Sequence, residues 1–323
     1  MKRIAVFTSG GDSPGMNACI RAVTRTGIAK GLEVFGIRSG YEGMIEDDIF
    51  PLEKHAVSNI IQLGGTILQS ARSKSFLTPE GRKKAYDNLK KHGIEGVVAI
   101  GGDGTFRGAH VFMQEHPDMA MIGIPGTIDN DLSGTDFTIG YDTAINTAMN
   151  AIDNIKDTAN AHNRLFFVEV MGRDAGFIAL SSAIATGAEA VLIPESKTDI
   201  RKLVGVLKDN YQNKKRSSII VVAEGDEAGG AFDIAKYVKI ECPEFDIRVT
   251  VLGHIQRGGR PTCNERVLAS RLGMEAVKAL LAGKKDVMVG EVNKEIAYTP
   301  FEHATKQHQG INPALLEMVE LLS

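Results

Sequence analysis

The sequence has few of the features that mark secreted, membrane or nucleic-acid-binding proteins. It contains only three cysteines, Cys19, Cys242 and Cys263. Their odd number and the lack of CxxC spacing fit a reducing cytoplasm and disfavour a disulfide framework or a zinc site. No apolar stretch approaches the length of a membrane span. The formal net charge of −3 at pH 7 gives no overall basic field, so we expect no nucleic-acid partner.

The first residues, MKRIAVFTSGGD, carry two charges and then a short apolar run before turn residues. We interpret this segment as a first β-strand and not as a signal peptide. With the cysteine pattern, it predicts a soluble, cytoplasmic protein that has no membrane partner. The length of 323 residues exceeds one usual core, so we expect one large or two medium α/β domains.

Strand-like and helix-like segments alternate along the chain. A strand at 2–8, a helix from Met16 and a strand at 32–37 form a βαβ unit, which implies a parallel sheet. Further strands are expected at 96–100, 119–124, 165–172, 190–194, 217–225 and 246–254, and further helices from about Phe106, from about Thr143 to Thr158, and at 264–283 before Gly283. The pattern predicts an α/β fold with two open, mostly parallel (Rossmann-like) sheets. The two domains would meet near residue 140, with the active site in the cleft between them.

Two glycine-rich segments, SGGDSPG (9–15) and GGDGT (101–105), follow predicted strands. Glycine lets a backbone approach a phosphate closely, and the N–H groups at a helix N-terminus favour an anion. Asp103 would repel that anion unless a metal such as Mg²⁺ lay between them. An ordinary strand-to-helix turn with aspartate as the cap is the alternative. GGDGT is neither a Walker A loop nor a GxGxxG motif.

An acidic pair, Asp129 and Asp131, lies in PGTIDND (125–131) behind an expected Pro-Gly turn. In an extended segment the two carboxylates would share one face, and their repulsion would raise one pKa, as suits a general base. A solvated turn is the alternative. The acidic pair and GGDGT follow neighbouring predicted strands, which favours chemistry: one carboxylate could hold metal while another accepts a proton.

Several arginines are candidates for binding phosphate. Each single arginine could be an ordinary surface residue, and His254 could be a core contact. Two or three charged hydrogen bonds, at roughly 1.5 to 3 kcal/mol each, would nevertheless hold a phosphorylated substrate. The candidates at or near predicted strand ends are Arg164, Arg173, Arg248 and Arg257, with Arg72 in QSARSKSF.

In their order and spacing, TSGGDSPGMNA, GGDGT, PGTIDND, VEVMGR and VLGHIQRGG resemble the bacterial ATP-dependent 6-phosphofructokinase family over essentially the whole chain. The resemblance implies a homotetramer that uses MgATP to phosphorylate the 1-hydroxyl of fructose 6-phosphate. It also implies an ATP-binding domain at 1–140 plus about 256–306, and a sugar-phosphate domain at about 141–255 plus 307–323.

The resemblance assigns roles to individual residues. Asp129 would be the base, Asp103 the Mg²⁺ ligand, and Arg173 the group that stabilises the transferred phosphoryl group; Thr127 and Arg72 would assist. ATP would be bound by Gly11, Arg72, Ser73, Gly102, Asp103, Gly104 and Thr105. The sugar phosphate would be bound by Thr127, Ile128, Asp129, Asp131, Met171, Gly172, Arg173, Glu224, His254 and Arg257, and by Arg164 and Arg248 of a neighbouring subunit.

Two glycines bear on the phosphoryl donor. Pyrophosphate-using relatives typically have Asp where Gly104 stands and Lys where Gly126 stands. A side chain at position 104 would invade space that the adenosine end of ATP needs, so ATP is favoured. The chain departs from the family pattern at Ser73, where an aromatic residue is common, and at Phe177, where an acidic residue is usual.

A regulatory site for ADP or phosphoenolpyruvate is also implied. Its residues would be Arg21, Arg25, Lys54, Lys156, Gly187, Glu189, Asn213 and Lys215. Lys54 and Lys156 replace arginines, and Asn213 replaces a common basic residue. Lysine keeps the charge but lacks the bidentate fork, so we expect weaker effector control than in typical relatives. A solvated arginine face on the first helix is the alternative.

The sequence allows three alternative functions. A pyrophosphate-dependent kinase is disfavoured by Gly104 and Gly126. A kinase of NAD or lipid would not need the arginine set. A non-catalytic nucleotide or sugar-phosphate sensor would not need Asp103, Asp129 and Arg173 together.

Overall fold

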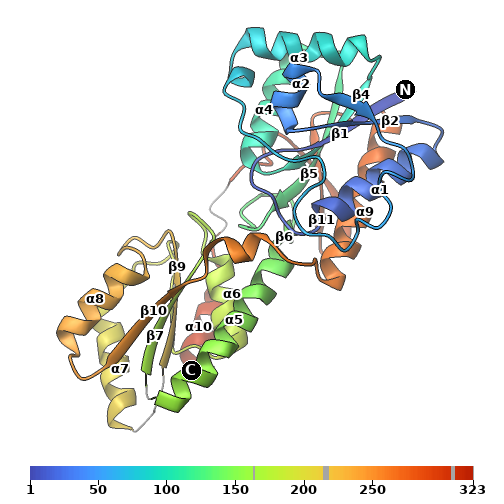
Figure 1. The fold of residues 1–323 in the computed structure, drawn as a ribbon. Coiled ribbons are helices and arrows are strands. Elements are labelled where there is room, and N and C mark those ends of the chain that lie inside the picture. The colour runs from blue at the N-terminus through green and yellow to red at the C-terminus, as the bar shows by residue number, and fades with distance from the viewer. Residues whose placement is uncertain (163, 214–217, 307–309, 323) are drawn as a thin grey trace. The chain divides into compact units, whose positions relative to one another are not determined.

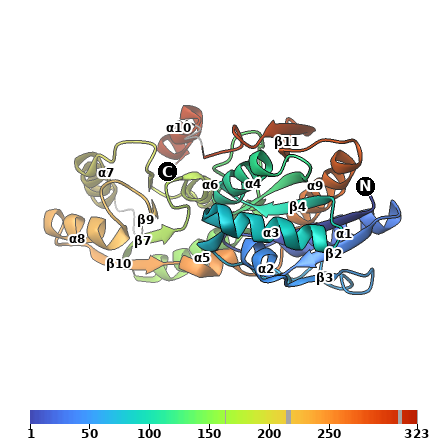
Figure 2. The ribbon, with the colours of Figure 1, turned by 90° about the horizontal axis from the view of Figure 1, so that it is seen from above.

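The computed structural model describes residues 1–162, 164–213, 218–306 and 310–322. They form two units (Figures 1 and 2). Unit 1 comprises Met1–Ile128, Leu132–Thr143 and the described part of Arg257–Gln307. Unit 2 comprises Asp129–Asp131, Ala144–Gln256 and the described part of His308–Ser323.

Unit 1 is built on an eight-stranded sheet of order β12-β11-β5-β4-β1-β2-β3, with β6 paired to β5. The pairs are parallel except β2 with β3 and β11 with β12 at the two edges. The strands are β1 (Arg3–Thr8), β2 (Glu33–Ile37), β3 (Ile49–Pro51), β4 (Gly96–Gly101), β5 (Ala120–Thr127), β6 (Ile139–Gly140), β11 (Val287–Val292) and β12 (Glu295–Pro300).

Helices cover both faces of this sheet because alternate strand residues point to opposite sides. Ile4 and Val6 pack in one buried cluster with α1 and α9, whereas Ala5 and Phe7 pack in another with α2, α3 and α4 (Figure 1). The helical elements are α1 (Met16–Ala29), α2 (Gly40–Glu46), η1 (Ser75–Leu77), α3 (Pro79–Lys91), α4 (Asp103–Glu115) and α9 (Cys263–Leu281). Gly283 follows α9 with φ +77°, as expected of a glycine beyond a helix C-terminus.

Unit 2 has a parallel four-stranded sheet of order β10-β7-β9-β8. Helices α7 and α8 lie on one side of it, and α5, α6 and α10 on the other (Figure 1). The strands are β7 (Arg164–Val170), β8 (Ala190–Leu192), β9 (Ser218–Ala223) and β10 (Asp246–Val251), and the helices are α5 (Tyr141–His162, which begins in unit 1), α6 (Phe177–Thr186), α7 (Ile200–Gln212), α8 (Ala231–Glu241) and α10 (Pro313–Leu322); a 3₁₀ turn, η2, spans Gly253–Arg257.

The predicted fold class, α/β with two open and mostly parallel sheets, is confirmed. The expected Pro-Gly turn is wrong, because β5 continues through Pro125 and Gly126 to Thr127. Pairing with β4 and β6 on either side keeps these residues extended. Helix α4 begins at Asp103, three residues before the predicted start. Among the described residues, no helix is both long and apolar enough to cross a membrane.

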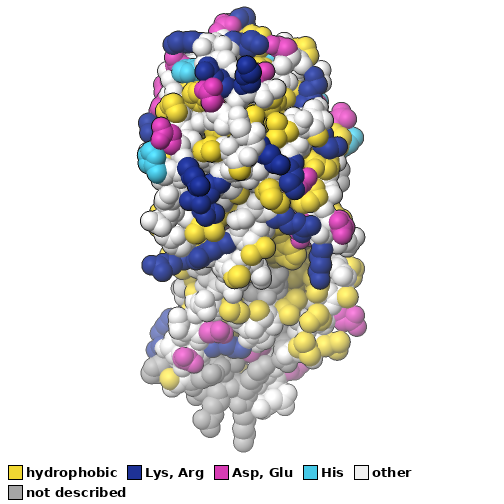
Figure 3. All heavy atoms as spheres, turned by 90° about the vertical axis from the view of Figure 1, so that its right-hand side faces the viewer, with side chains coloured by type: hydrophobic (Ala, Val, Ile, Leu, Met, Phe, Trp, Pro, Cys, Tyr) yellow, Lys and Arg dark blue, Asp and Glu magenta, His cyan; other side chains and the backbone are white. Residues whose placement is uncertain are grey.

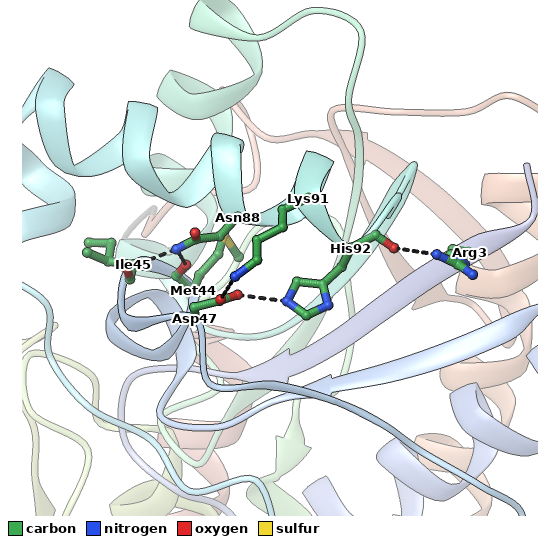
Figure 4. A network of polar contacts seen from close by, with 7 residues as sticks. All are labelled: Arg3, Met44, Ile45, Asp47, Asn88, Lys91 and His92. Atoms are coloured by element: carbon green, nitrogen blue, oxygen red, sulfur yellow. Dashed lines mark hydrogen bonds and ion pairs between the residues drawn. The ribbon is translucent and has the colours of Figure 1, made fainter.

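A polar network joins α2, α3 and β1 in unit 1 (Figure 4). Asp47, which follows α2 at φ +67°, contacts Lys91 Nζ with Oδ2 at 2.6 Å and His92 Nε2 with Oδ1 at 2.7 Å. Asn88 donates to the last carbonyl groups of α2, and the His92 carbonyl accepts from Arg3. The hydrogen bond from Lys91 is the main cause that holds the pKa of Asp47 below its ordinary value, against an opposing effect of burial.

We predict that Asp47→Asn lowers the free energy of unfolding by about 1 kcal/mol near pH 7. A carboxyl group whose folded pKa is lowered contributes stability above its unfolded pKa, and that contribution is lost as the pH falls through the folded value. The difference from the wild type should therefore shrink below about pH 4. Urea titrations at several pH values measure it.

The matched control is Asp87→Asn, which removes an exposed partner of Lys83 within one helix and should change stability little. Equal losses for the two variants, or a loss at Asp47 that persists in acid, would contradict the role of the network.

Candidate active site

Three polar segments of the chain follow the carboxyl ends of adjacent parallel strands. Residues 9–15 follow β1, 102–105 follow β4, and 128–131 follow β5. The strands lie in the order β5-β4-β1, with Thr8 beside Ile100 and Gly101 beside Pro125. The predicted neighbourhood of GGDGT and the acidic segment therefore holds at the level of the sheet. Ligands bind at such strand ends in open α/β sheets.

The GGDGT segment is a close-packed strand-to-helix turn. A side chain on Gly101 would bring its Cβ to 2.4 Å from Thr105 Oγ1 and 2.7 Å from the Ser9 carbonyl oxygen. Gly102 precedes α4, and its carbonyl accepts from Thr105 N–H at 2.9 Å. A Cβ on Gly104, by contrast, would meet nothing within 4 Å. The first turn of α4 thus borders open space at Gly104, which is what a bound nucleotide requires.

Asp103 is the first residue of α4, and its side chain is 16% exposed. Its Oδ1 accepts from Arg107 Nε at 3.0 Å and from Lys306 N–H at 3.1 Å. Both contacts use Oδ1. Mg²⁺ in nucleotide sites takes one or two carboxylates together with phosphate oxygens, and among the described residues no group of three possible metal-ligating side chains occurs. The single carboxylate of Asp103 fits a metal shared with a phosphate ligand.

Gly11 and Arg257 are neighbours within unit 1. A Cβ on Gly11 would lie 2.5 Å from Arg257 Nη1, which itself donates to the Asp12 carbonyl at 3.3 Å. The absence of a side chain at position 11 therefore makes room for the guanidinium. Two motifs that lie 245 residues apart in sequence are joined at this point, one predicted to bind ATP and the other the sugar phosphate.

The acidic segment is buried where the chain leaves β5. Ile128 is fully buried, Asp129 is 3% exposed and Asp131 is 7% exposed, so the solvated-turn alternative does not hold. The Thr127 carbonyl accepts a hydrogen bond from Thr138 Oγ1 at 2.6 Å. The extended geometry expected for the pair is wrong, because Asn130 has a left-handed φ of +53°.

Arg173 lies beside Asp129 within unit 2, with 3.8 Å between Arg173 Nε and Asp129 Oδ2. The arginine is 46% exposed at its side chain, whereas the carboxylate side chain is 4% exposed. The pair presents a buried acceptor and an accessible positive charge at one place. This is the arrangement that general-base and phosphoryl-transfer chemistry uses.

Glu224 fixes the turn that carries Arg173. Its Oε1 accepts from the N–H groups of Arg173 at 2.9 Å and of Gly172 at 3.3 Å. Arg173 is in the left-handed region at φ +54°, and a Cβ on Gly225 would lie 1.8 Å from its carbonyl oxygen. The carboxylate of Glu224 thus holds a strained turn that aims the arginine.

Residues from the end of β7 and from η2 meet at the carboxyl edge of the small sheet. Met171 is 8% exposed, and its N–H donates to Oε1 of the fully buried Gln256 at 3.3 Å. His254, in the same turn, is exposed, so it is not the core contact that sequence reasoning allowed. Its side chain is accessible to a ligand.

Arg164 and Arg248 do not lie with Arg173. Arg164 is the first residue of β7, and Arg173 lies in the turn that follows its last residue, Val170. The length of the strand, about 20 Å at 3.3 Å per residue, therefore separates Arg164 from that turn. Both arginines pair with Asp246, at 2.9 and 2.6 Å, and Arg164 is the main cause that holds the pKa of Asp246 low. Within one chain, Arg164 and Arg248 are therefore apart from Arg173. Their action from a neighbouring subunit stays a prediction.

The segment with Arg72 and Ser73 precedes η1. Arg72 is exposed and accessible to a ligand. Ser73, which departs from the family pattern, has a local role because its Oγ accepts from Phe76 N–H at 3.0 Å. Phe177 begins α6, and nothing in the structure explains the loss of an acidic residue there.

The predicted effector residues fall in both units. Arg21 and Arg25 lie one turn apart on α1 and are half-buried. Figure 3 shows Lys and Arg side chains spread over one side of unit 1, among hydrophobic and acidic ones. In unit 2, Lys156 Nζ donates to the Thr186 carbonyl and to the Gly187 carbonyl at 3.3 Å. Lys54 is exposed, and so is Asn213, which follows α7. Glu189 is buried and accepts a hydrogen bond from Ile219 N–H. Lys215 lies outside the described residues.

Two residues were missed by sequence reasoning, Gln256 and Glu265. Both are buried, at 0% and 1% exposure. Gln256 lies in GHIQRGG, the motif in which Arg257 was predicted to bind the sugar phosphate. Glu265 stands three residues after Thr262, a spacing that is typical of a helix capping box.

Glycine-rich turns at the carboxyl ends of parallel strands, with a buried acid and nearby arginines, define an α/β protein built to bind phosphorylated ligands. A family model described as phosphofructokinase matches residues 3–280. The chain belongs to the phosphofructokinase family.

Named relatives cover the whole chain. It is 57% identical to ATP-dependent 6-phosphofructokinase 1 of Thermus thermophilus over 323 residues, covering 100% of both chains. It is 54% identical to ATP-dependent 6-phosphofructokinase 2 of Bacteroides thetaiotaomicron, covering 100% of this chain and 99% of that one.

Among solved structures, phosphofructokinase from Saccharomyces cerevisiae has a TM-score of 0.90 and 37% identity over 99% of this chain, which spans 47% of the yeast chain. A pyrophosphate-dependent phosphofructokinase from Marinobacter aquaeolei, at 22% identity, has a TM-score of 0.86 over 100% of this chain and 91% of that one. At this identity it supports the fold only.

Two alanine substitutions in the GGDGT turn should differ in their effects on stability. Gly101→Ala forces Cβ against the Ser9 carbonyl and Thr105, so we expect a loss of about 1 to 3 kcal/mol in the free energy of unfolding. Gly104→Ala adds a methyl group into open space in the first turn of α4, so we expect no loss, or a gain of up to about 1 kcal/mol. Urea titration of the two variants gives the comparison. Equal effects would show that the turn is not packed as described.

Proposed function

We propose that this chain is an ATP-dependent 6-phosphofructokinase, which transfers the γ-phosphoryl group of MgATP to the 1-hydroxyl of fructose 6-phosphate. The products are fructose 1,6-bisphosphate and ADP, in a step of glycolysis. The observation that carries the mechanism is the buried Asp129 carboxylate 3.8 Å from the Arg173 guanidinium. The relatives named above support the choice of substrates.

Asp129 accepts the proton of the sugar 1-hydroxyl as its oxygen attacks the γ-phosphorus. Thr127 and Asp131 flank this base on the chain. Arg173 supplies positive charge where negative charge develops on the transferred group, and Glu224 keeps its turn in place. Phosphoryl transfer depends chiefly on such positioning and electrostatic stabilisation.

The nucleotide is bound by the glycine-rich turns of unit 1. Gly11, Gly102, Gly104 and Thr105 present backbone and open space to ATP, and Arg72 and Ser73 lie in the segment before η1. Asp103 would hold Mg²⁺, which would offset the charge of the phosphates. We assign ATP binding to residues 1–140 plus about 256–306, and sugar-phosphate binding to about 141–255 plus 307–323.

The sugar phosphate is bound by residues at the carboxyl edge of the small sheet and by arginines. Ile128, Met171, Gly172, His254 and Arg257 act from the same chain. Arg164 and Arg248 act from a neighbouring subunit of a homotetramer. This fits the position of Arg164 at the start of β7 and of Arg248 beside Phe166 in β10, away from Arg173. The enzyme works in the cytoplasm.

A coupled assay of ADP release tests the function directly. We expect ADP release with fructose 6-phosphate and MgATP, and none when pyrophosphate replaces ATP, because Gly104 leaves space for the nucleotide. Tagatose 6-phosphate and fructose 1-phosphate report the substrate range. ATP binding without ADP release would indicate a sensor, and turnover with pyrophosphate would indicate the other donor class.

Asp129→Ser should reduce kcat by about a thousandfold while KM for fructose 6-phosphate changes little, because a general base acts mainly in the transition state. Asp118→Asn, an exposed aspartate beside Tyr86 and Lys90, is the control and should keep wild-type turnover. Substantial turnover by Asp129→Ser would assign the base elsewhere.

Effector control by ADP or phosphoenolpyruvate should be weak. Lys156 already contacts two backbone carbonyls and lacks the bidentate fork, and Glu189 serves the backbone of β9. We expect either effector to change KM for fructose 6-phosphate by less than about fivefold, and Lys156→Arg to increase the effect. A strong shift in the wild type would contradict this expectation.

A further inference from the structure

Glu265 is a buried acid that the proposed mechanism leaves without a role. It lies in the first turn of α9, and its N–H donates to the capping hydroxyl of Thr262 at 3.2 Å. In a capping box the glutamate side chain would return to the N–H of the capping residue. Here the Thr262 N–H donates to Thr143 Oγ1 at 3.3 Å instead. The carboxylate is therefore available to another part of the chain.

The carboxylate of Glu265 binds the segment that leads into α5. Its Oε1 accepts from Gly140 N–H at 2.7 Å, and its Oε2 accepts from the N–H and the hydroxyl of Thr143, each at 3.1 Å. Three donors thus converge on a side chain that is 1% exposed. An ionised carboxylate satisfies all three, because it accepts at both oxygens.

This segment lies against the end of β5. Gly140 pairs with Thr127 in the β6–β5 ladder, and a Cβ on Gly140 would lie 2.4 Å from Ser13 Cβ and 3.1 Å from Ile128 Cγ2. Ser13 Oγ donates to the Ile139 carbonyl at 2.8 Å. A displacement of β6 would therefore be transmitted to residues 127 and 128, directly before Asp129.

We propose that Glu265 is a positioning residue for phosphoryl transfer: its ionised carboxylate holds Gly140 and Thr143, and through β6 it fixes the end of β5 that carries the catalytic base. The inference rests on the proposed function, since it requires Asp129 to act as that base.

The site has a pH dependence that follows from its burial. Burial raises the pKa of Glu265 to about 7, although the hydrogen bonds from Gly140 and Thr143 lower it. Asp142, at the start of α5, adds a smaller upward effect through its negative charge. Gly15, before α1, also lies against Glu265, since a Cβ there would be 2.9 Å from Glu265 Cγ. The next residue of α9, Arg266, donates from Nε to the Pro261 carbonyl at 2.8 Å.

Protonation turns one accepting oxygen into a donor that faces other donors. Turnover should therefore fall as the pH falls through about 7. Stability should change in the opposite direction, because a carboxyl group with a raised folded pKa binds more protons in the folded state, which favours folding at lower pH. A purely structural role would not separate the two trends.

The test compares Glu265→Gln with Glu275→Gln, the same change farther along α9, where Glu275 accepts from Tyr298 and Lys278. Values of kcat and KM are measured from about pH 6 to about pH 8.5. We expect Glu265→Gln to lower kcat about tenfold at the alkaline end with KM values within about twofold, because a small misplacement of a reacting group is costly. Its kcat should no longer fall toward pH 6, whereas Glu275→Gln keeps the wild-type profile.

Thr143→Val is a second variant that leaves the carboxylate in place. It removes one hydrogen bond that lowers the pKa of Glu265, so the acid limb of kcat should move to higher pH. The shift of the acid limb in Thr143→Val tests the proposal even if Glu265→Gln does not fold. A folded Glu265→Gln with wild-type kcat and profile, or an unmoved limb in Thr143→Val, overturns the proposal. An inactive wild type would instead refute the proposed function.

Discussion

The structure of the site depends on the parallel pairing of β1, β4 and β5. Their register places Thr8 beside Ile100 and Gly101 beside Pro125, so the segments that follow leave the sheet at one edge. Gly101 is needed there because a side chain would strike the Ser9 carbonyl. Backbone pairing and close approach bring the two glycine-rich turns together, and the acidic segment follows the next strand. Strand register thus decides which segments lie together at the site.

The second requirement is a turn that aims a positive charge at a buried acid. Arg173 lies in a left-handed conformation that is unfavourable for a non-glycine residue. Two N–H donors to Glu224 and the close approach of Gly225 hold it there. These local contacts offset the strain of the left-handed conformation. The Arg173 guanidinium lies beside Asp129 although Arg173 belongs to neither a helix nor a strand. Strain of this kind is common where function fixes a side-chain direction.

Much of the fold and many segments of the candidate site could be predicted from sequence, because apolar periodicity and strand ends depend on residues that are close together in the chain. The strands at 2–8, 96–100 and 119–124 are apparent as apolar runs, each followed by a segment that contains glycine and aspartate. Pro125 and Gly126 misled the prediction, since pairing on both sides keeps them extended despite their turn propensity. The positive φ of Asn130 and the contact of Glu265 with Gly140, across 125 residues, could not be predicted, because both are set by tertiary packing. Residue roles inferred from family resemblance stay predictions until they are tested.

The most direct measurement is a crystal structure of the enzyme with fructose 6-phosphate and a non-hydrolysable analogue of MgATP. We expect a carboxylate oxygen of Asp129 within about 3.2 Å of the sugar 1-hydroxyl oxygen, with the Arg173 guanidinium directed at the γ-phosphate. A complex in which the 1-hydroxyl is held by other groups, and Asp129 has no contact with the sugar, would contradict the assignment of the base.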